Sequence, residues 1–274
     1  MSTLAEDLTP LSEPLPDTSG VVATARVRAE HNGRTTVLPL LSGDGPFHLQ
    51  RLRPRDGLAR VDVIGAMSGP LGGDRLAFHT DIGPRARLRI TAAASTIALR
   101  GPTDEAATYD IRLTVGEDAA LHWLPQPLIS TAGSGLRQTC AVALAPTARL
   151  VLRDEQVLGR TGETSGDLTT RLTVLRGGRP LLDQHTSYGA PHPGWDGPAV
   201  VGPHRACGQL LVVDPALTQA GLPPVLLGDP DGPAHGVLAP LAGPALLATA
   251  VADTATRLRH LLDEALRRAL AAGR

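Results

Sequence analysis

The sequence GPRARL at residues 83–88 recurs as GEDAAL at residues 116–121 and as APTARL at residues 145–150. All three copies share a small first residue, an alanine three positions later and a leucine five positions later. Each copy follows a segment in which apolar and polar residues alternate, as they do in a β-strand with one buried face. A repeat of about thirty residues, made of a strand, a tight turn and a return strand, is typical of a stacked β architecture.

We therefore predict a mainly β fold with a stacked, solenoid-like or sandwich-like body. A weaker fourth copy, GGRPLL at residues 177–182, extends the predicted stack, and a meander of ordinary hairpins is the alternative source of the pattern. Residues at equal offsets become neighbours when such units stack. Three residues lie ten positions after the start of a copy and are predicted to line one side of the stack: Ala93, Gln126 and Glu155.

The loop at residues 65–76, GAMSGPLGGDRL, contains too much glycine and proline for a helix or a packed strand. We expect Gly69, Gly72 and Gly73 to shape its backbone. The loop then presents one acidic side chain, Asp74, at the start of the following strand, at the mouth of the stack beside the polar residues of the repeats.

The remaining sequence predicts a disordered N-terminal tail followed by a single β-rich domain that ends in a helix. Residues 1–20 have the composition of a disordered tail, and residues 21–274 form a single β-rich domain. Residues 189–204 and 222–245 are dense in glycine and proline and are expected to be long irregular connections. Apolar residues at helical spacing predict a C-terminal helix over about residues 254–271.

Composition excludes several classes of function. The net charge of −1 and the 2% content of aromatic residues disfavour binding to nucleic acid or to a membrane surface. The sequence has no lysine, which excludes a phosphate-binding lysine and Schiff-base chemistry. Cys140 and Cys207 are too few for a disulfide framework, and Cys140 is expected to be a small core residue. Without an apparent signal sequence or membrane span, we expect a cytoplasmic protein.

No catalytic residues and no tightly bound cofactor are predicted. Neither Ser68 nor Ser134 lies in a nucleophile motif, and the histidines lack the spacing of a local metal site. Oxygen donors could still form a weak path for a cation, for which Asp74, Asp154, Glu155 and Glu163 are the candidates. Solvated turns or carboxylates that cap the backbone explain the same residues equally well.

Four short motifs stand in order within residues 21–214: GGDRL at 72–76, a threonine-bearing segment at 91–96, LHWLPQ at 121–126, and EQVLGR at 155–160, which is followed by Gly162, Glu163 and Gly166. Together they resemble the UreD (also called UreH) family of urease accessory proteins. The sequence departs from the family pattern at Ala92 and Ala93, at Ile97 and at Pro127, where relatives carry polar residues.

The resemblance implies a scaffold that resembles a chaperone and is not an enzyme. Such a protein binds the urease apoprotein, bridges it to a helical accessory protein (UreF type) and through that partner to a GTPase (UreG type), and helps to deliver nickel. Nickel is then in transit through an internal channel of a largely β fold. The residues predicted for this path or for a partner surface are Asp74, Thr91, Gln126, Asp154, Glu155, Arg160 and Glu163.

A second reading is a β-solenoid hydrolase that acts on carbohydrates through a carboxylate pair such as Asp154 and Glu163. The scarcity of aromatic residues that could stack on sugars counts against it. The scaffold reading predicts that replacing Asp74 and Glu155 by alanine lowers urease activation while the protein stays folded.

Overall fold

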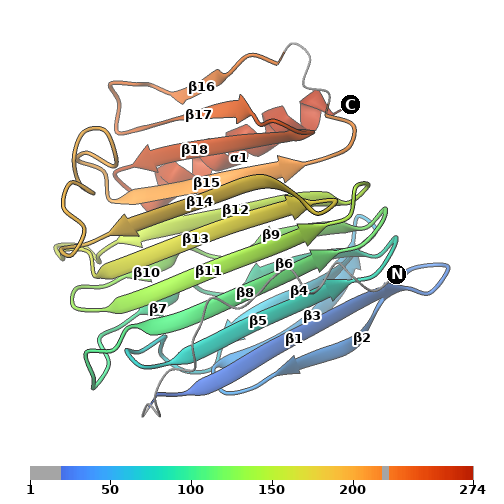
Figure 1. Ribbon diagram of the computed structural model, residues 1–274, viewed down its shortest axis with the longest axis horizontal. Coiled ribbons are helices and arrows are strands. Elements are labelled where there is room, and N and C mark those ends of the chain that lie inside the picture. Colours follow the sequence, from blue (N-terminus) through green and yellow to red (C-terminus); the bar gives the residue numbers. More distant parts are fainter. Residues whose placement is uncertain (1–19, 218–221, 274) are drawn as a thin grey trace.

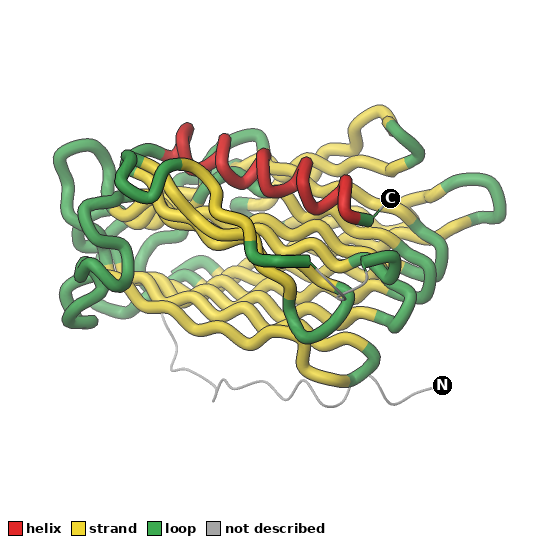
Figure 2. The backbone as a smooth tube through the Cα atoms, turned by 90° about the horizontal axis from the view of Figure 1, so that it is seen from above, coloured by secondary structure: helices red, strands yellow, loops and turns green. Residues whose placement is uncertain are grey.

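The structure, a computed structural model, describes residues 20–217 and 222–273. Two β-sheets lie face to face, and one helix, α1 (Ala255–Ala272), covers the outer side of the larger sheet (Figures 1 and 2). The prediction of a mainly β, stacked fold with a C-terminal helix is therefore confirmed.

The seven-stranded sheet contains, in spatial order, β14 (Arg179–Tyr188), β13 (Asp167–Arg176), β11 (Gly135–Leu144), β8 (Ala107–Val115), β5 (Arg75–Ile82), β1 (Val22–His31) and β2 (Thr36–Gly43). The eleven-stranded sheet contains β16 (Val225–Gly228), β17 (Ala234–Pro240), β18 (Ala245–Ala252), β15 (Ala206–Val213), β12 (Arg149–Leu158), β9 (Ala120–Leu124), β6 (Arg87–Ala92), β4 (Leu58–Gly65) and β3 (Phe47–Arg55), with β10 (Leu128–Ser130) between β12 and β7 (Thr96–Ala98).

Three coils wind between the sheets, from β5 to β6, from β8 to β9 and from β11 to β12. Equivalent strands pair in parallel, and the repeated sequence motifs form the turns at which the chain crosses from one sheet to the other. Successive turns are hydrogen-bonded, since the amide of Gly116 donates to the carbonyl of Ile82 (2.8 Å) and the amide of Ala145 donates to that of Val115 (2.9 Å). The repeat in the sequence is thus a structural repeat.

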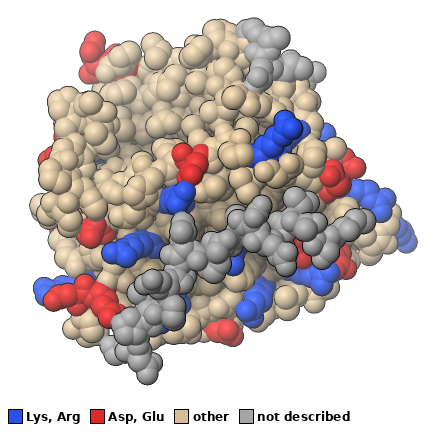
Figure 3. Space-filling view, in the orientation of Figure 1, with Lys and Arg blue, Asp and Glu red and all other residues tan. Residues whose placement is uncertain are grey.

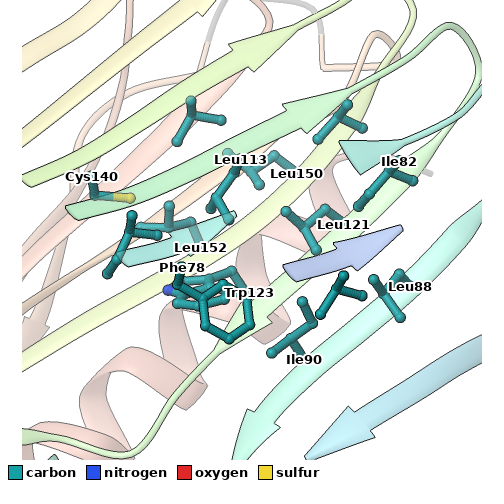
Figure 4. Close-up of a cluster of buried hydrophobic side chains, with 14 of the residues drawn as sticks. Phe78, Ile82, Leu88, Ile90, Leu113, Leu121, Trp123, Cys140, Leu150 and Leu152 are labelled. Atoms are coloured by element: carbon teal, nitrogen blue, oxygen red, sulfur yellow. The ribbon is translucent and has the colours of Figure 1, made fainter. Parts of the chain in front are cut away.

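The alanine and the leucine that the three copies of the motif share occupy buried positions. The turn alanines Ala86, Ala119 and Ala148 have no exposed surface. The leucines two positions later are buried as well, and they join a core that fills the space between the sheets (Figure 4). Small residues are required at these turns because the next turn packs directly against them.

Replacing Ala119 by leucine is expected to destabilise the protein by about 1–3 kcal/mol, because the turn has no room for three more carbon atoms. Urea unfolding measures the change. Ala141→Leu is the matched control, since Ala141 is only partly buried and lies on the outer side of β11. It should change stability by less than about 0.5 kcal/mol. Equal losses in the two variants would contradict the packing of the turns.

Two local predictions are wrong. The fourth copy of the repeat is not a crossing between sheets, since residues 177–178 close an antiparallel hairpin between β13 and β14. Both glycines there have positive φ angles, of 55° and 74°, which suit a tight hairpin turn. Residues 222–245 are not an irregular connection, because they contain β16 and β17.

The other boundaries agree with the structure. Residues 189–205 form an irregular connection before β15, and α1 begins one residue after the N-cap Thr254, whose side chain accepts a hydrogen bond from the amide of Arg257. The predicted tail lies, apart from Gly20, outside the described residues. Within the described parts of the chain, no helix has the length and hydrophobicity needed to cross a bilayer.

Candidate functional site

A network of charged side chains lies between β12 and α1. The Arg259 guanidinium of α1 binds both carboxylate oxygens of Glu155, with distances of 2.7 Å from Nε and 2.5 Å from Nη2. Arg153 contacts Glu155 (3.3 Å) and also binds Asp263 of α1 (2.8 Å). The Glu155 side chain keeps only 1% of its surface exposed, whereas Asp263 is 52% exposed, so this network of charges joins the helix to the sheet from a buried carboxylate out to the surface.

The network brings together two residues that the repeat predicted to be neighbours. The side-chain oxygen of Gln126 accepts a hydrogen bond from Arg259 (3.2 Å), the same guanidinium that holds Glu155. The equal offsets in the repeat therefore correctly placed Gln126 and Glu155 together. The sequence did not predict that Arg259 joins these residues, because Arg259 lies on a helix outside the repeat and 104 residues after Glu155.

A second polar group lies in the interior, which we define as the space between the two sheets. The side chains of β12 alternate, so Leu150 and Leu152 face the interior core while Val151 packs on the helix side. Asp154 consequently faces inward, away from its neighbour Glu155. It is surrounded by the side chains of Gln138, Gln156 and Gln209, which we call, together with Asp154, the interior polar cluster.

Burial raises the pKa of the Asp154 carboxyl, and hydrogen bonds from Gln156, Gln209 and Gln138 oppose the rise. Asp154 lies deep in the protein and yet keeps part of its surface accessible, which indicates that it borders a small internal space. The side-chain oxygen of Gln209 is closed to solvent and has no hydrogen-bond partner in the described structure.

Both cysteines lie at the edge of the interior polar cluster. Cys207 is buried and its sulfur is 3.8 Å from the side-chain oxygen of Gln156. Cys140 is buried in the core, as the sequence predicted, and both cysteines are free thiols. Burial raises the pKa of both thiols, and the Asp154 charge raises them further. The cluster therefore combines carboxylate, amide and thiol groups inside an otherwise aliphatic core.

Asp154→Asn is expected to stabilise the protein at neutral pH. Since the pKa of Asp154 is raised from its ordinary value of 3.8, the folded chain holds this proton more tightly than the unfolded chain. Ionisation therefore favours unfolding, and stability falls as pH rises from 3.8 through the raised pKa. Thermal unfolding at several pH values should show a higher melting temperature for the variant at pH 7 and a smaller difference as the pH falls toward 4. A variant less stable than the wild type at pH 7 would contradict this.

Asp74 lies away from both the charge network at α1 and the interior polar cluster. Its carboxylate oxygens accept hydrogen bonds from the amides of Val21 and Leu71, each at 2.8 Å, and it is 7% exposed. The side chain thus closes the loop before β5 and ties it to the start of β1. The expected position beside Gln126 and Glu155 is wrong, because those residues lie on the helix side of the other sheet.

The backbone geometry of this loop requires glycine at two positions, Gly72 and Gly73. Gly73 has a φ of +91°, which side-chain-bearing residues rarely adopt. A Cβ atom on Gly72 would lie 2.8 Å from the carbonyl oxygen of Glu105. The loop before β5 therefore needs glycine at both positions, and this close approach to the neighbouring loop positions Asp74.

Arg160 and Glu163 form an exposed ion pair in the turn after β12. The Nε atom of Arg160 lies 2.9 Å from both carboxylate oxygens of Glu163, and neither side chain is buried. A groove of about 400 Å³ crosses the loops at this end of the stack, and its lining includes Gly72 and Thr164. The structure thus brings the loops of Asp74 and Glu163 to one groove.

Thr91 also lies outside the interior. Its hydroxyl donates a hydrogen bond to Asp62 (2.6 Å), its cross-strand partner on the helix side of the eleven-stranded sheet. The carboxylate pair of the hydrolase reading is not formed, since Asp154 faces the interior and Glu163 is bound to Arg160 in an exposed turn.

The view onto the seven-stranded sheet shows basic and acidic side chains scattered among neutral ones (Figure 3). Arg171 and Asp183 pair on this sheet at 2.9 Å. Among the described residues, no group of three or more histidine, cysteine or acidic side chains is arranged to hold a metal ion.

Comparison with known proteins agrees with the resemblance in the motifs. The sequence model of the family described as "UreD urease accessory protein" matches residues 21–274. The chain is 62% identical to urease accessory protein UreD 2 of Saccharopolyspora erythraea over 248 residues, which cover 90% of this chain and 88% of the relative. It is 57% identical to UreD 3 of Streptomyces griseus over 255 residues, covering 91% and 97%. The chain therefore belongs to the UreD family of urease accessory proteins.

Proposed function

We propose that this protein is a non-enzymatic scaffold for urease maturation, through which nickel reaches the urease apoprotein past the interior polar cluster. Membership of the UreD family supports a urease accessory role. The observation that carries the finer proposal is the Asp154 carboxylate, which is placed with amide and thiol groups in a core built mainly from leucine, valine and alanine.

The energetics of Asp154 argue for a role in function. A buried carboxylate costs stability unless it is fully paired, and no arginine binds this one in the described structure. A core that served packing alone would be more stable with an apolar residue at this position. Groups that cost stability and border an internal space are expected where a fold serves transport or binding.

The chemistry of the interior polar cluster suits a metal ion in passage. Carboxylate and amide oxygens bind divalent cations, and thiols bind softer ones once they lose a proton. The thiol pKa values are raised, so the thiols stay protonated at neutral pH and bind weakly. Weak, scattered ligands are appropriate to an ion that must leave again.

The test is complementation in a cell whose urease genes are intact and whose gene for this protein is deleted. Deletion should abolish urease activation. The Asp154→Asn variant should restore roughly a tenth or less of the urease activity given by the wild type. Nickel bound to purified urease, measured by inductively coupled plasma mass spectrometry, should fall in proportion.

Asp81→Asn is the matched control, since Asp81 is an exposed aspartate on the outer side of β5. It should activate urease like the wild type. Full activation by Asp154→Asn would overturn the interior path, and normal urease in the deletion strain would overturn the accessory role. The melting temperature of the purified Asp154→Asn protein shows whether a loss of activation comes from unfolding.

The partners in this proposal are the urease apoprotein, the UreF-type helical accessory protein and, through it, the UreG-type GTPase. Co-expression with a tag on this chain should co-purify the helical partner, and the GTPase only when that partner is present. Recovery of the GTPase without the helical partner would contradict the proposed order of contacts.

A further inference from the structure

We infer that His204 and His235 form a two-histidine site for a divalent transition-metal ion such as Ni²⁺ or Zn²⁺. His204 lies at the end of the irregular connection before β15, and His235 lies near the start of β17. The two residues are brought together only by the fold. Their spacing along the chain gives no sign of a site.

The geometry of the two rings fits one shared metal ion. The ring centroids are 5.0 Å apart, with the ring planes at 77°. A histidine nitrogen binds zinc at about 2.0–2.1 Å, and two imidazoles on one ion at tetrahedral or square angles then have centroids roughly 5 Å apart. The observed separation matches this distance. The two rings meet edge to face, so binding requires ring rotations that turn one nitrogen of each ring toward the ion.

The environment leaves a ring nitrogen of His235 in need of a partner. Its Nδ1 atom is closed to solvent and has no hydrogen-bond partner among the described residues. A buried polar atom left without a partner costs stability.

Among the described residues, the carboxylate that acts on His204 is that of Asp253, and it is already engaged. Its side chain is bound by Arg257 one helical turn further on. We therefore expect two protein ligands, with water in the remaining positions. Imidazole nitrogen favours nickel, copper and zinc over magnesium and calcium, which sets the class of metal.

The position of the site relates it to the interior polar cluster. Residues paired across strands point to the same side of a sheet, and the row that begins at His235 continues through Val251 and Cys207 to Gln156. The strands β16 to β18 extend past β14, the last strand of the other sheet (Figure 1). The histidine pair thus lies where the inner face of the larger sheet emerges from between the sheets.

Metal binding by the pair is tested on purified full-length protein that carries no affinity tag, in a buffer that does not chelate metals. Calorimetric titration with NiCl₂ should show a binding step that weakens at least tenfold in His204→Ala and in His235→Ala. His48→Ala is the matched control, because His48 is exposed on β3 at the far edge of the same sheet. The control should bind like the wild type.

Two further measurements keep the inference testable if a variant folds poorly. His235→Gln retains most of the volume of the side chain and should also lose the step. Electron paramagnetic resonance of the wild type with one equivalent of Cu²⁺ should show coupling to two nitrogen nuclei. An unchanged titration in both His235 variants, or coupling to a single nitrogen, would overturn the site.

The test is independent of the urease role. It uses this chain alone, and Asp154→Asn should leave the histidine step unchanged. Failure of complementation by Asp154→Asn together with intact binding at the histidine pair would separate the two proposals, as would the opposite pair of results.

Discussion

Glu155→Ala is expected to destabilise the protein by about 3–5 kcal/mol, because removing one partner of a buried ion pair leaves the other charge uncompensated. Arg259 and Arg153 would then face each other beneath α1 without the carboxylate between them. Chemical denaturation measures the loss. Hydrogen exchange should also show faster exchange across α1, since the helix loses its main polar attachment to the sheet.

The matched control is Glu264→Ala on the same helix. Glu264 pairs with Arg268 one turn away, at the surface, and helix pairs of this kind contribute about 0.3–0.5 kcal/mol. The double variant Glu155→Met with Arg259→Met should be more stable than either single variant, because no charge is then left unpaired. Additive losses would show that the ion pair has no coupling of its own.

This result bears on how Glu155 can be tested for function. The sequence led us to expect that replacing Asp74 and Glu155 by alanine would leave the protein folded. In the structure, Asp74 ties a loop to β1 and Glu155 ties α1 to β12, so that double variant is now expected to be strongly destabilised. A loss of urease activation in it would not identify a nickel path.

Phe78→Ala should cost about 3–5 kcal/mol, the range for removing a buried phenylalanine. Phe78 has no exposed surface, and its ring lies edge-on to that of Trp123 (Figure 4), with 5.0 Å between the ring centroids. It also lies edge-on to Phe47, at 6.1 Å. The chain has two residues each of phenylalanine, tyrosine and tryptophan, so few other large side chains can fill the space.

Denaturation with guanidinium chloride measures this loss, and Phe78→Leu provides the comparison. Leucine fills most of the volume and should cost less than about 1.5 kcal/mol. Because Phe78, Trp123 and Phe47 come from three strands on both sheets, the loss should appear as one cooperative shift of the whole transition. A separate early transition would contradict a single core between the sheets.

The coils were predictable because two independent signals coincide in them. The alternation of apolar residues marks the strands, and the small residue, alanine and leucine at fixed offsets mark turns that pack on one another. The strands β16 and β17 were missed because they are short and lie among glycine and proline. Pro240 is tolerated because it is the last residue of β17.

The candidate site was predictable only in part. Equal offsets in the repeat placed Gln126 with Glu155, and period-two alternation along β12 could also have shown that Asp154 and Glu155 face opposite sides. The partners Arg259 and Gln209 could not have been found, because they lie on a helix and an antiparallel strand outside the repeat. The histidine pair depends in the same way on a loop and on β17, which lie outside the repeat.

The parallel ladder of the seven-stranded sheet sets the length of the body. Five strands, β1, β5, β8, β11 and β13, stack in register, and neighbouring strands lie about 4.8 Å apart. Four such steps span roughly 19 Å. A homologue with one more coil would hold its N-terminal hairpins and its C-terminal helix farther apart by one step, with neither end redesigned. The number of coils therefore sets the distance between the two ends of the protein, and a partner that contacts both ends must match that distance.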